Sequence, residues 1–352
     1  KLTINNEYYV SLAYKYLINK DYSTKIYPLQ HFFQWGTPED VSDYTYFSEM
    51  FKSIHKQKKY KKTLKHKLIV PAAGLGLRFQ KKGYSVIKPL IKVSGKEMIV
   101  QSCSNISASE AYVISRKNTL KKNSFDFNFV HKIIELNKPT NGQATTAMLG
   151  VKEYLLSNND NSKIPITITA CDTSFTYDQK EFNSLLGTNY DIIVWSIKGY
   201  PNSKKFPEMY GWLEECADGS IKKVSVKKPI KNNIENAIVL GTFTFRNAEI
   251  YSKCYASLVE RNGKVNSEYY IDELVNDAIT MGYNCKIFLV DSYLCWGTPA
   301  DLETFNYWQA CFHKWNHHPY TLQSDFMIDK NDCEILVDKY SDQNFSKKEH
   351  DQ

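Results

Sequence analysis

The residues best suited to chemistry lie where a short apolar segment runs into a turn of small residues and then into basic residues. The turn reads Pro-Ala-Ala-Gly-Leu-Gly-Leu-Arg-Phe at positions 71–79. Its small residues let backbone N–H groups come close to a phosphate chain, and they are Ala72, Ala73, Gly74 and Gly76. Arg78 and Lys88 follow, and each supplies fixed positive charge for a triphosphate and its transition state. The stretch therefore predicts a phosphate site.

This glycine turn differs from two common nucleotide-binding motifs. A dinucleotide-binding turn needs a third glycine, but Phe79 stands at that position, and no acidic residue ends a second strand about 20 residues further on. A Gly-x-x-x-x-Gly-Lys-[Ser/Thr] loop does not occur either. The remaining pattern is a glycine turn followed by an arginine, and then Lys-Pro-Leu before a Gly-Lys turn.

Length and composition limit the kind of protein that carries this turn. The chain has 352 residues, of which 42% are hydrophobic and 14% aromatic, so it can bury a large core and is not disordered. No apolar run approaches the ~18 residues of a membrane-spanning helix, and the first residues do not resemble a signal peptide. The eight cysteines show no framework spacing, which favours a reduced, cytoplasmic compartment.

The net charge of +7 is concentrated in one segment. Positions 52–67 hold eight lysines and no acid, so the rest of the chain is close to neutral. A dedicated nucleic-acid binder would usually carry its positive charge on the folded domain, and we therefore expect no nucleic-acid partner. The basic segment is interpreted as a solvated linker, with a docking strip for an acidic partner as the alternative.

The chain contains an internal repeat without a gap. Residues 7–51 align with residues 268–312 at a constant offset of 261, and both copies carry Glu-Tyr-Tyr and Trp-Gly-Thr-Pro at the same separation. In each copy an amphipathic helix is expected after Glu-Tyr-Tyr, followed by a short strand at 25–29 or 286–290. The repeat predicts a duplicated module.

The Trp-Gly-Thr-Pro turn predicts the start of another helix in each copy. Thr37 or Thr298 can cap that helix, the proline after it fits the first turn, and an aspartate three residues after the threonine completes a capping-box relative. This structural interpretation accounts for the motif, and we assign it no catalytic role.

The repeat also predicts the domain organisation. Residues 1–52 are expected to be the tail of a preceding duplicated module, 53–66 a Lys-rich linker, 67–312 a catalytic domain and 313–352 a C-terminal extension. Either the chain is an excerpt of a longer tandem protein, or the tail is retained as a packing element.

The segment Pro-Ala-Ala-Gly-Leu-Gly-Leu-Arg-Phe, followed by Lys-Pro-Leu-Ile-Lys-Val-Ser-Gly-Lys-Glu-Met-Ile, resembles the signature of the sugar-phosphate nucleotidyltransferases, especially those of bacterial capsule biosynthesis. The resemblance continues in order through residues 67–312. It includes 139–147 as the base-binding loop, 168–175 around the metal aspartate, 210–229 as the hairpin before the acceptor lysine, and 241–245, 268–274 and 296–305.

This resemblance implies an α/β fold with a Rossmann-like, mixed, twisted sheet of the nucleotidyltransferase (GT-A-like) type. The implied reaction joins a nucleoside triphosphate to a phosphorylated acceptor, such as a sugar 1-phosphate, and releases pyrophosphate. Arg78 would hold the triphosphate, and Lys88 would contact the α-phosphate or the acceptor phosphate. Asp172 would bind Mg²⁺, with Asp272 as a second ligand. The product would be a precursor of surface polysaccharide.

The remaining implied roles concern binding. Ala73, Gly74 and Gly76 would line the nucleotide site, Asn137 and Gly142 would read the base edge, and Lys228 would grip the acceptor phosphate. Several of the implied site residues also have a purely structural interpretation. Asp172 could cap a turn at a strand end, Asp272 could be a solvated helix carboxylate beside Glu273, and the two loop residues could serve backbone geometry alone.

Two positions depart from the family's pattern. The glutamate that usually precedes the acceptor lysine is missing, because Val226 and Lys227 stand there, and a more anionic or non-sugar phosphate would suit Lys227 better. In the first repeat copy the position of Asp272 is Ser11, which suggests that the preceding module lacks that ligand.

Two other classes of function compete with nucleotidyl transfer. A nucleotide-sugar-binding glycosyltransferase would show Asp-x-Asp after the central strand, whereas the sequence here reads Cys-Asp-Thr-Ser. A non-catalytic regulatory module would account for the orphan tail, but Arg78, Lys88 and Asp172 together argue against it. The base, the acceptor, and the choice between a tandem partner domain and a homo-oligomer stay open.

Overall fold

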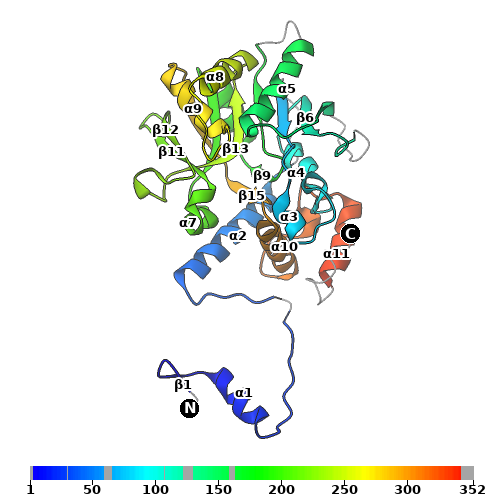
Figure 1. Ribbon diagram of the computed structural model, residues 1–352. Coiled ribbons are helices and arrows are strands. Elements are labelled where there is room, and N and C mark those ends of the chain that lie inside the picture. The colour runs from blue at the N-terminus through cyan, green and yellow to red at the C-terminus, as the bar shows by residue number, and fades with distance from the viewer. Residues whose placement is uncertain are drawn as a thin grey trace.

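The computed structural model describes residues 3–29, 31–58, 66–106, 108–121, 130–157 and 163–341. Its centre is a mixed sheet in the order β12-β11-β13-β8-β3-β6-β7, with β10 pairing β13 and β14 (Figure 1). The strands of this sheet are β3 (Lys67–Pro71), β6 (Glu110–Arg116), β7 (Val130–Leu136), β8 (Ile166–Ile168), β10 (Ile192–Ile197), β11 (Gly211–Glu215), β12 (Ile221–Val226), β13 (Ile238–Phe245) and β14 (Cys285–Leu289).

Parallel and antiparallel pairing divide this sheet into two halves. β3 runs parallel to β6 and β8, and β6 runs parallel to β7. β13 runs antiparallel to β8, β10 and β11, whereas β14 is parallel to β10. The expected α/β fold with a mixed, Rossmann-like sheet is therefore confirmed.

Helices cover both faces of the sheet, which explains why its strands read as continuous apolar runs. Leu68 and Val70 of β3 face a core that includes Ile99, whereas Ile69 between them faces a second core that includes Ala147. The helices are α1 (Val10–Ile18), α2 (Pro38–Lys56), α3 (Leu77–Lys81), α4 (Met98–Ser104), α5 (Gln143–Ser157), α6 (Gln179–Leu186), α7 (Pro201–Lys205), α8 (Ala248–Glu260), α9 (Ile271–Thr280), α10 (Pro299–Lys314) and α11 (Lys330–Ser341).

Shorter elements connect these layers. The two-residue strands β4 (Lys92–Val93) and β5 (Lys96–Glu97) pair with each other, and β9 (Thr173–Thr176) pairs with β15 (Ser292–Cys295). β1 (Thr3–Ile4) pairs with β2 (Glu7–Tyr8). Four 3₁₀ turns are η1 (Lys88–Leu90), η2 (Pro207–Met209), η3 (Ile230–Asn232) and η4 (Leu322–Ser324).

Paired threonine hydroxyls fix the alignment of β8 against β13. The hydroxyl oxygens of Thr167 and Thr244 are 2.9 Å apart, and those of Thr169 and Thr242 are 2.8 Å apart. All four residues are buried, and the Trp195 indole donates to Thr244 Oγ1 at 3.1 Å. These cross-strand pairs satisfy hydroxyls that would otherwise be costly to bury.

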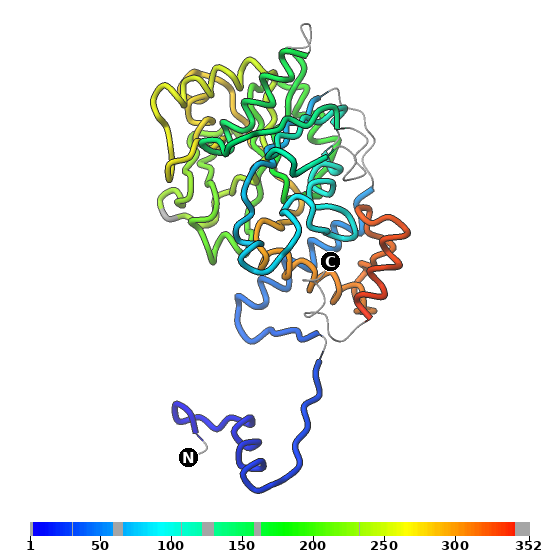
Figure 2. The backbone as a smooth tube through the Cα atoms, turned by 45° about the vertical axis from the view of Figure 1, so that its right-hand side comes forward, coloured from blue at the N-terminus to red at the C-terminus, as the bar shows by residue number. Residues whose placement is uncertain are grey.

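The N-terminal segment behaves differently from the rest. Residues 3–29 extend away from the body, and α1 buries none of its residues (Figures 1 and 2). The strand expected at 25–29 does not form, whereas its counterpart forms β14, which pairs with β10. A strand needs a neighbouring strand for its backbone hydrogen bonds, and among the described residues no strand lies beside 25–29.

Both predicted Trp-Gly-Thr-Pro helix starts are confirmed. Thr37 and Thr298 each accept a hydrogen bond from the backbone N–H of the aspartate three residues on, and each aspartate caps in return. α2 packs its apolar side, including Phe51 and Ile54, into the core formed with α10. The first copy is thus half docked and half exposed.

The C-terminal extension packs against the body as far as position 341. α11 lies beside the turn at Gly95, whose positive φ of 89° and lack of a Cβ admit the side chain of Asp332. Part of the Lys-rich linker (59–65) and the polar end (342–352) lie outside the described residues. Along the part of the chain that is described, no helix combines the length and apolarity needed to cross a bilayer.

Candidate active site

The glycine turn lies at the carboxyl end of β3, where a buried strand gives way to α3. Ala72 and Ala73 are buried, whereas Gly74 is exposed and a Cβ there would meet no atom within 4 Å. Gly76 has a φ of 65°, and a Cβ on it would lie 3.1 Å from Lys88 Cβ. A glycine is needed here for both reasons, and its closeness brings the turn against Lys88.

Lys88 and Asp172 form the most enclosed ion pair beside this turn. Lys88 Nζ contacts Asp172 Oδ2, and it donates a second hydrogen bond to the Gly297 carbonyl at 2.9 Å. Both side chains are about one-fifth exposed, at 19% and 20%. The ammonium also lies 5.7 Å from the centre of the Phe79 ring. Residues from three distant parts of the chain, around positions 79–88, 172 and 297, therefore meet at one charged group.

The surroundings of Lys88 keep it protonated. Burial alone would lower the pKa of the ammonium, but the nearby Asp172 carboxylate outweighs it, and the net effect is a raised pKa. Burial is the largest cause that raises the pKa of the neighbouring Cys171 thiol to about 12, so this thiol is neutral near pH 7. Lys88 is consequently suited to hold an anion and unsuited to act as a general base.

Gly297 is a site residue that sequence reasoning missed. The Trp-Gly-Thr-Pro motif was assigned to helix capping alone, yet its glycine offers a carbonyl to Lys88, and a Cβ there would lie 3.4 Å from Asp172 Oδ2. The backbone N–H of Trp296 also donates to the backbone carbonyl of Asp172 at 3.0 Å. The sequence did not reveal this role, because helix capping accounts for the motif on its own.

A second cluster joins the predicted base-binding loop to the start of α9. The Tyr269 N–H donates to the Asn141 carbonyl at 2.7 Å, and the Ala144 N–H donates to the Tyr269 carbonyl at 3.0 Å. A Cβ on Gly142 would lie only 2.6 Å from the Tyr269 backbone. Gly142 is therefore required for this close docking, whatever else it binds.

Asp272 lies in the first turn of α9, pressed against β11. A Cβ on Gly211 would come within 2.1 Å of Asp272 Oδ2, so the glycine makes room for the carboxylate. Burial is the largest cause that raises the pKa of Asp272 to about 6, and Lys227 opposes this shift. Lys227 has a φ of 60°, a conformation that is strained for a lysine, and its Nζ lies 5.2 Å from the centre of the Tyr270 ring.

One stretch of β13 connects the two clusters. The Ala170 N–H, two residues before Asp172, donates to the Gly241 carbonyl at 3.2 Å. Two residues earlier on β13, Val239 pairs with Gly211, the residue that contacts Asp272. The two predicted metal carboxylates thus flank positions 239–241 of the same strand.

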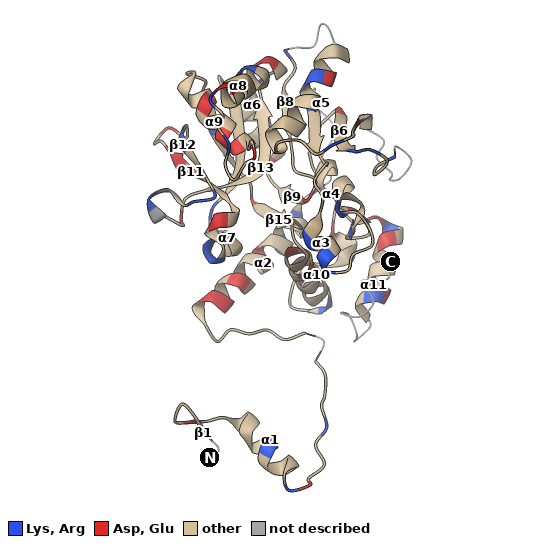
Figure 3. Ribbon diagram, viewed as in Figure 1, with Lys and Arg blue, Asp and Glu red and all other residues tan. Residues whose placement is uncertain are grey.

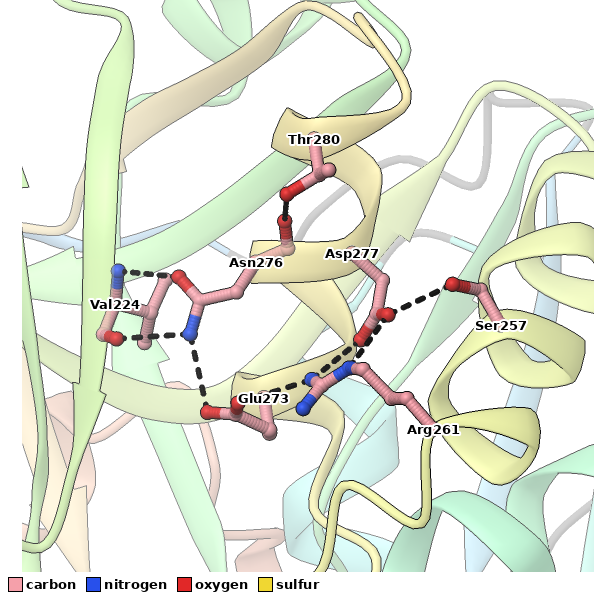
Figure 4. A network of polar contacts seen from close by, with 7 residues as sticks. All are labelled: Val224, Ser257, Arg261, Glu273, Asn276, Asp277 and Thr280. Carbon is pink, nitrogen blue, oxygen red and sulfur yellow. Dashed lines mark hydrogen bonds and ion pairs between the residues drawn. The ribbon is translucent and has the colours of Figure 1, made fainter.

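A polar network beneath α9 holds this helix in place (Figure 4). Arg261 Nε and Nη2 donate to the two carboxylate oxygens of Asp277 at 2.8 and 2.6 Å, and Nη2 also reaches Glu273 at 2.9 Å. Asn276 accepts from the Val224 N–H and donates to the Val224 carbonyl, both at 2.9 Å. The network ties α9 to the end of α8 and to β12, and so fixes where Asp272 lies.

Three of the predicted site residues stand apart from both clusters. Arg78, Asn137 and Lys228 are exposed, and among the described residues no hydrogen bond or ion pair of their side chains is found. Arg78 nevertheless lies on α3, which begins directly after Gly76. Lys228 follows Lys227, and of the two it is Lys227 that approaches Asp272. The structure thus assembles Gly76, Lys88 and Asp172, and separately Gly142 and Asp272.

The available donors suit a hard divalent cation only in part. Asp172 and Asp272 offer carboxylate oxygens, which Mg²⁺ prefers, and the raised pKa of Asp272 indicates a buried carboxylate without a full counter-charge. Within the described ranges no group of three or more His, Cys, Asp and Glu side chains could hold a metal. Two carboxylates fit the usual Mg²⁺ site, where substrate phosphates and water complete the coordination.

The comparisons with known proteins bear on the fold. No family model and no curated protein sequence matches the chain. Among solved structures, a nucleoside-diphosphate-sugar pyrophosphorylase from Vibrio cholerae RC9 is 21% identical with a TM-score of 0.55, and the match covers 68% of this chain and 98% of that one.

Two further structures are similar to the same extent. An inositol-1-phosphate CTP transferase from T. maritima is 17% identical with a TM-score of 0.52, over 70% of this chain and 97% of that one. A putative glucose-1-phosphate thymidylyltransferase from Bacillus anthracis is 16% identical with a TM-score of 0.52, over 68% and 94%. The chain therefore has the fold of these nucleotidyltransferases.

Proposed function

We propose that this protein is a Mg²⁺-dependent nucleotidyltransferase. It would join a nucleoside triphosphate to a phosphorylated acceptor and release pyrophosphate, in the synthesis of a surface-polysaccharide precursor. The observation that carries the proposal is the meeting of Gly76, Lys88, Asp172 and Gly297 at the carboxyl ends of β3 and β8. Ligands of open α/β sheets bind at such ends, and the fold is that of known nucleotidyltransferases.

In the proposed reaction an oxygen of the acceptor phosphate attacks the α-phosphorus. The bond from the α-phosphorus to the bridging oxygen breaks, and pyrophosphate leaves with the electron pair. The acceptor phosphate is already a nucleophile near pH 7, so positioning and charge neutralisation are the main tasks. A bound Mg²⁺, held by Asp172 and Asp272, would supply Lewis-acid stabilisation of the phosphate oxygens.

The chain's own residues would do the rest of the work. The N–H groups at Gly74 and Gly76 would bind the triphosphate, and Arg78 would neutralise the charge that develops on the leaving group. Lys88 stays protonated. When the triphosphate binds, its α-phosphate would compete with Asp172 for the Lys88 ammonium and so contact it. Asn137 and the loop at Gly142 would contact the base, and Lys228 would contact the acceptor phosphate.

Lys227 gives a clue to the acceptor. It stands where related enzymes carry a glutamate that contacts sugar hydroxyls, and it is held in a strained conformation near Asp272. An acceptor with a further negative charge, or a non-sugar phosphate, would suit a cation there.

Eight cysteines, none of them in a disulfide, fit a reducing cytoplasm, where nucleoside triphosphates are available.

The test is pyrophosphate release with Mg²⁺ across CTP, UTP, dTTP, GTP and ATP. Pooled sugar 1-phosphates form one set of acceptors, and alditol and aminoalcohol phosphates form the other. Asp172→Asn and Lys88→Met should each lower the rate by about 10²–10³-fold, as loss of a preorganised charge contact does. Lys92→Met, an exposed lysine on β4, is the matched control and should keep the parent rate.

Each outcome has a defined meaning. Release with one triphosphate, lost in both variants but not in the control, would support the proposal and identify the base. Equal rates in all four proteins would contradict the assigned site. Absence of triphosphate binding in calorimetry would contradict the reaction class itself.

A further inference from the structure

The two repeat copies meet each other in the structure, and they do so reciprocally. Phe47 stacks on Trp308, its own counterpart, with ring centres 5.5 Å apart. Phe51 likewise meets its counterpart Phe312 at 5.5 Å. In a two-fold interface, residues near the axis contact their own symmetry mates. These contacts therefore place a pseudo-two-fold axis between α2 and α10.

Contacts away from this axis occur in matched pairs, as the symmetry requires. Tyr46 Oη donates to the Tyr293 carbonyl at 3.0 Å and accepts from the Tyr293 N–H at 3.3 Å. The counterparts repeat the arrangement: Tyr307 Oη donates to the Phe32 carbonyl at 2.7 Å and accepts from the Phe32 N–H at 3.1 Å. An arrangement of this kind is isologous, and chance packing does not produce it.

The same correspondence holds within each copy. Trp35 meets Tyr44 edge-on, with ring centres 5.3 Å apart, and their counterparts Trp296 and Phe305 meet edge-on at 5.6 Å. The first copy from position 31 onward therefore has the local structure of the second. It behaves as the corresponding part of another module.

The first copy before position 31 lacks the surroundings that its counterpart has. Val10 is 81% exposed where Ile271 is fully buried, and Tyr27 is 80% exposed where Phe288 is 2% exposed. This segment is largely uncharged (Figure 3). Its apolar positions correspond to those that α9 and β14 bury against the sheet. Such a surface is typical of an unfilled interface.

We propose that residues 7–56 are the closing part of a second nucleotidyltransferase-like module. The pseudo-two-fold interface holds that module against this one, and residues 7–36 dock on its sheet. On the sheet of that second module, residues 25–29 add a parallel strand beside the strand equivalent to β10, and α1 covers the same sheet. In the module described here β14 already occupies the place beside β10, and it would do so in a second copy of this chain as well, so neither can accept residues 25–29.

The one proline in the segment fits this docking. Pro28 corresponds to Leu289. The Val290 N–H donates to Ser196 of β10, whereas the Ile287 N–H points the other way and donates to Gly219. Because N–H direction alternates along a strand, the Leu289 N–H also points away from β10. A proline at this position loses no hydrogen bond to the neighbouring strand.

A segment exchange in the full chain tests whether residues 7–36 carry this docking surface. Residues 7–36 are copied in place of residues 268–297, which leaves the length unchanged. Glu273, Asn276 and Asp277 are kept, because they bond partners outside the exchanged segment. The matched control is the same exchange with aspartate at the positions taken from Val10 and Tyr27. We expect the exchanged chain to unfold cooperatively in urea and the control to lose that transition.

Hydrogen exchange on the unaltered chain provides a second, independent measurement. Amides of 10–18 and 25–29 should exchange at least about 10³-fold faster than those of 271–280 and 285–289. Protection of 25–29 in a monomer would overturn the proposal, because the segment would then have a site on its own chain. Protection accompanied by a dimeric mass in sedimentation would overturn it in favour of a second copy.

An exchanged chain that unfolds no more cooperatively than its control would also overturn the proposal. None of these readouts depends on catalysis. Failure of the pyrophosphate assay and failure of the docking proposal are therefore separate results.

Discussion

Residues 7–29 and 268–290 share one sequence pattern and have opposite environments. Both form a helix at the same place, because a helix satisfies its own backbone hydrogen bonds. After this helix only the second copy forms a strand, β14, because a strand depends on a neighbour. Burial follows the same division, since α9 has buried residues and α1 has none. Pattern predicts local structure, whereas tertiary context decides whether that structure is stabilised.

The largest expected contrast concerns the two tryptophans of the repeated turn. Trp296→Ala should lower the free energy of unfolding by about 3–5 kcal/mol, because the side chain is fully buried and truncation leaves a cavity. Trp35→Ala, at the exposed counterpart, should cost less than about 1 kcal/mol. Urea denaturation measures both, and equal losses would mean that the first copy is packed in solution.

Arg261 ties the buried side of α9 to the end of α8, and its removal sharpens the comparison. Arg261→Met should cost roughly 3 kcal/mol, because it leaves the buried Asp277 carboxylate without its cation. Lys253→Met, which breaks an exposed ion pair on α8, is the control and should cost under about 0.5 kcal/mol. A loss equal to the control's would show that the network does not hold α9.

The two copies are followed by different segments. The Lys-rich linker follows α2, whereas a folded extension follows α10. In that extension Asp325 is buried and accepts from the Tyr320 hydroxyl at 2.8 Å and the Met327 N–H at 2.9 Å. Burial raises the pKa of Asp325 to about 6, from about 3.9 in an unfolded chain. Its contribution to stability is therefore present below about pH 4 and is lost as pH rises through about 6.

Asp325→Asn should remove this pH dependence. Relative to the variant, the parent should lose about 2–3 kcal/mol of unfolding free energy between about pH 4 and pH 7. Urea denaturation of both proteins across this range measures the difference. Parallel stability curves would show that Asp325 titrates as an ordinary exposed carboxylate.

The smallest expected contrast lies at the paired tyrosines. Tyr46→Phe removes a partly buried hydroxyl with two partners and should cost about 1–1.5 kcal/mol. Tyr307→Phe removes the corresponding hydroxyl at a more exposed place and should cost about 0.5 kcal/mol. Thermal unfolding of both variants measures the pair, and a larger loss for Tyr307 would indicate that residues 31–36 are more buried in solution than the structure shows.

The sequence predicted those parts of the fold that rest on local signals. The Thr-Pro helix starts, the apolar strands and the glycine turn were all placed correctly, because their residues determine backbone geometry directly. The strand at 25–29 was predicted wrongly for lack of a neighbour. The contact between Lys88 and Gly297 was not predicted, because 209 positions separate the two residues and no local rule joins them.

The candidate site could be predicted only by residue type. Lys88 and Asp172 were both selected, but their direct pairing could not be predicted, because 84 positions separate the two residues. Lys227 and Lys228 could not be distinguished from the sequence, and of the two it is Lys227 whose charge lowers the pKa of Asp272. Gly211, a residue 61 positions away, makes room for the Asp272 carboxylate, and burial is the largest cause that raises the pKa of Asp272.

The threonine pairs between β8 and β13 have a consequence for the distance over which Asp172 can act. A slip of two residues between these strands would keep only one of the two hydroxyl pairs and would displace the end of β8 by about 7 Å. A slip of one residue would turn every side chain to the opposite face. By fixing the register of β8 against β13 to within one residue, the buried hydroxyls determine how far the Asp172 carboxylate lies beyond the end of the sheet.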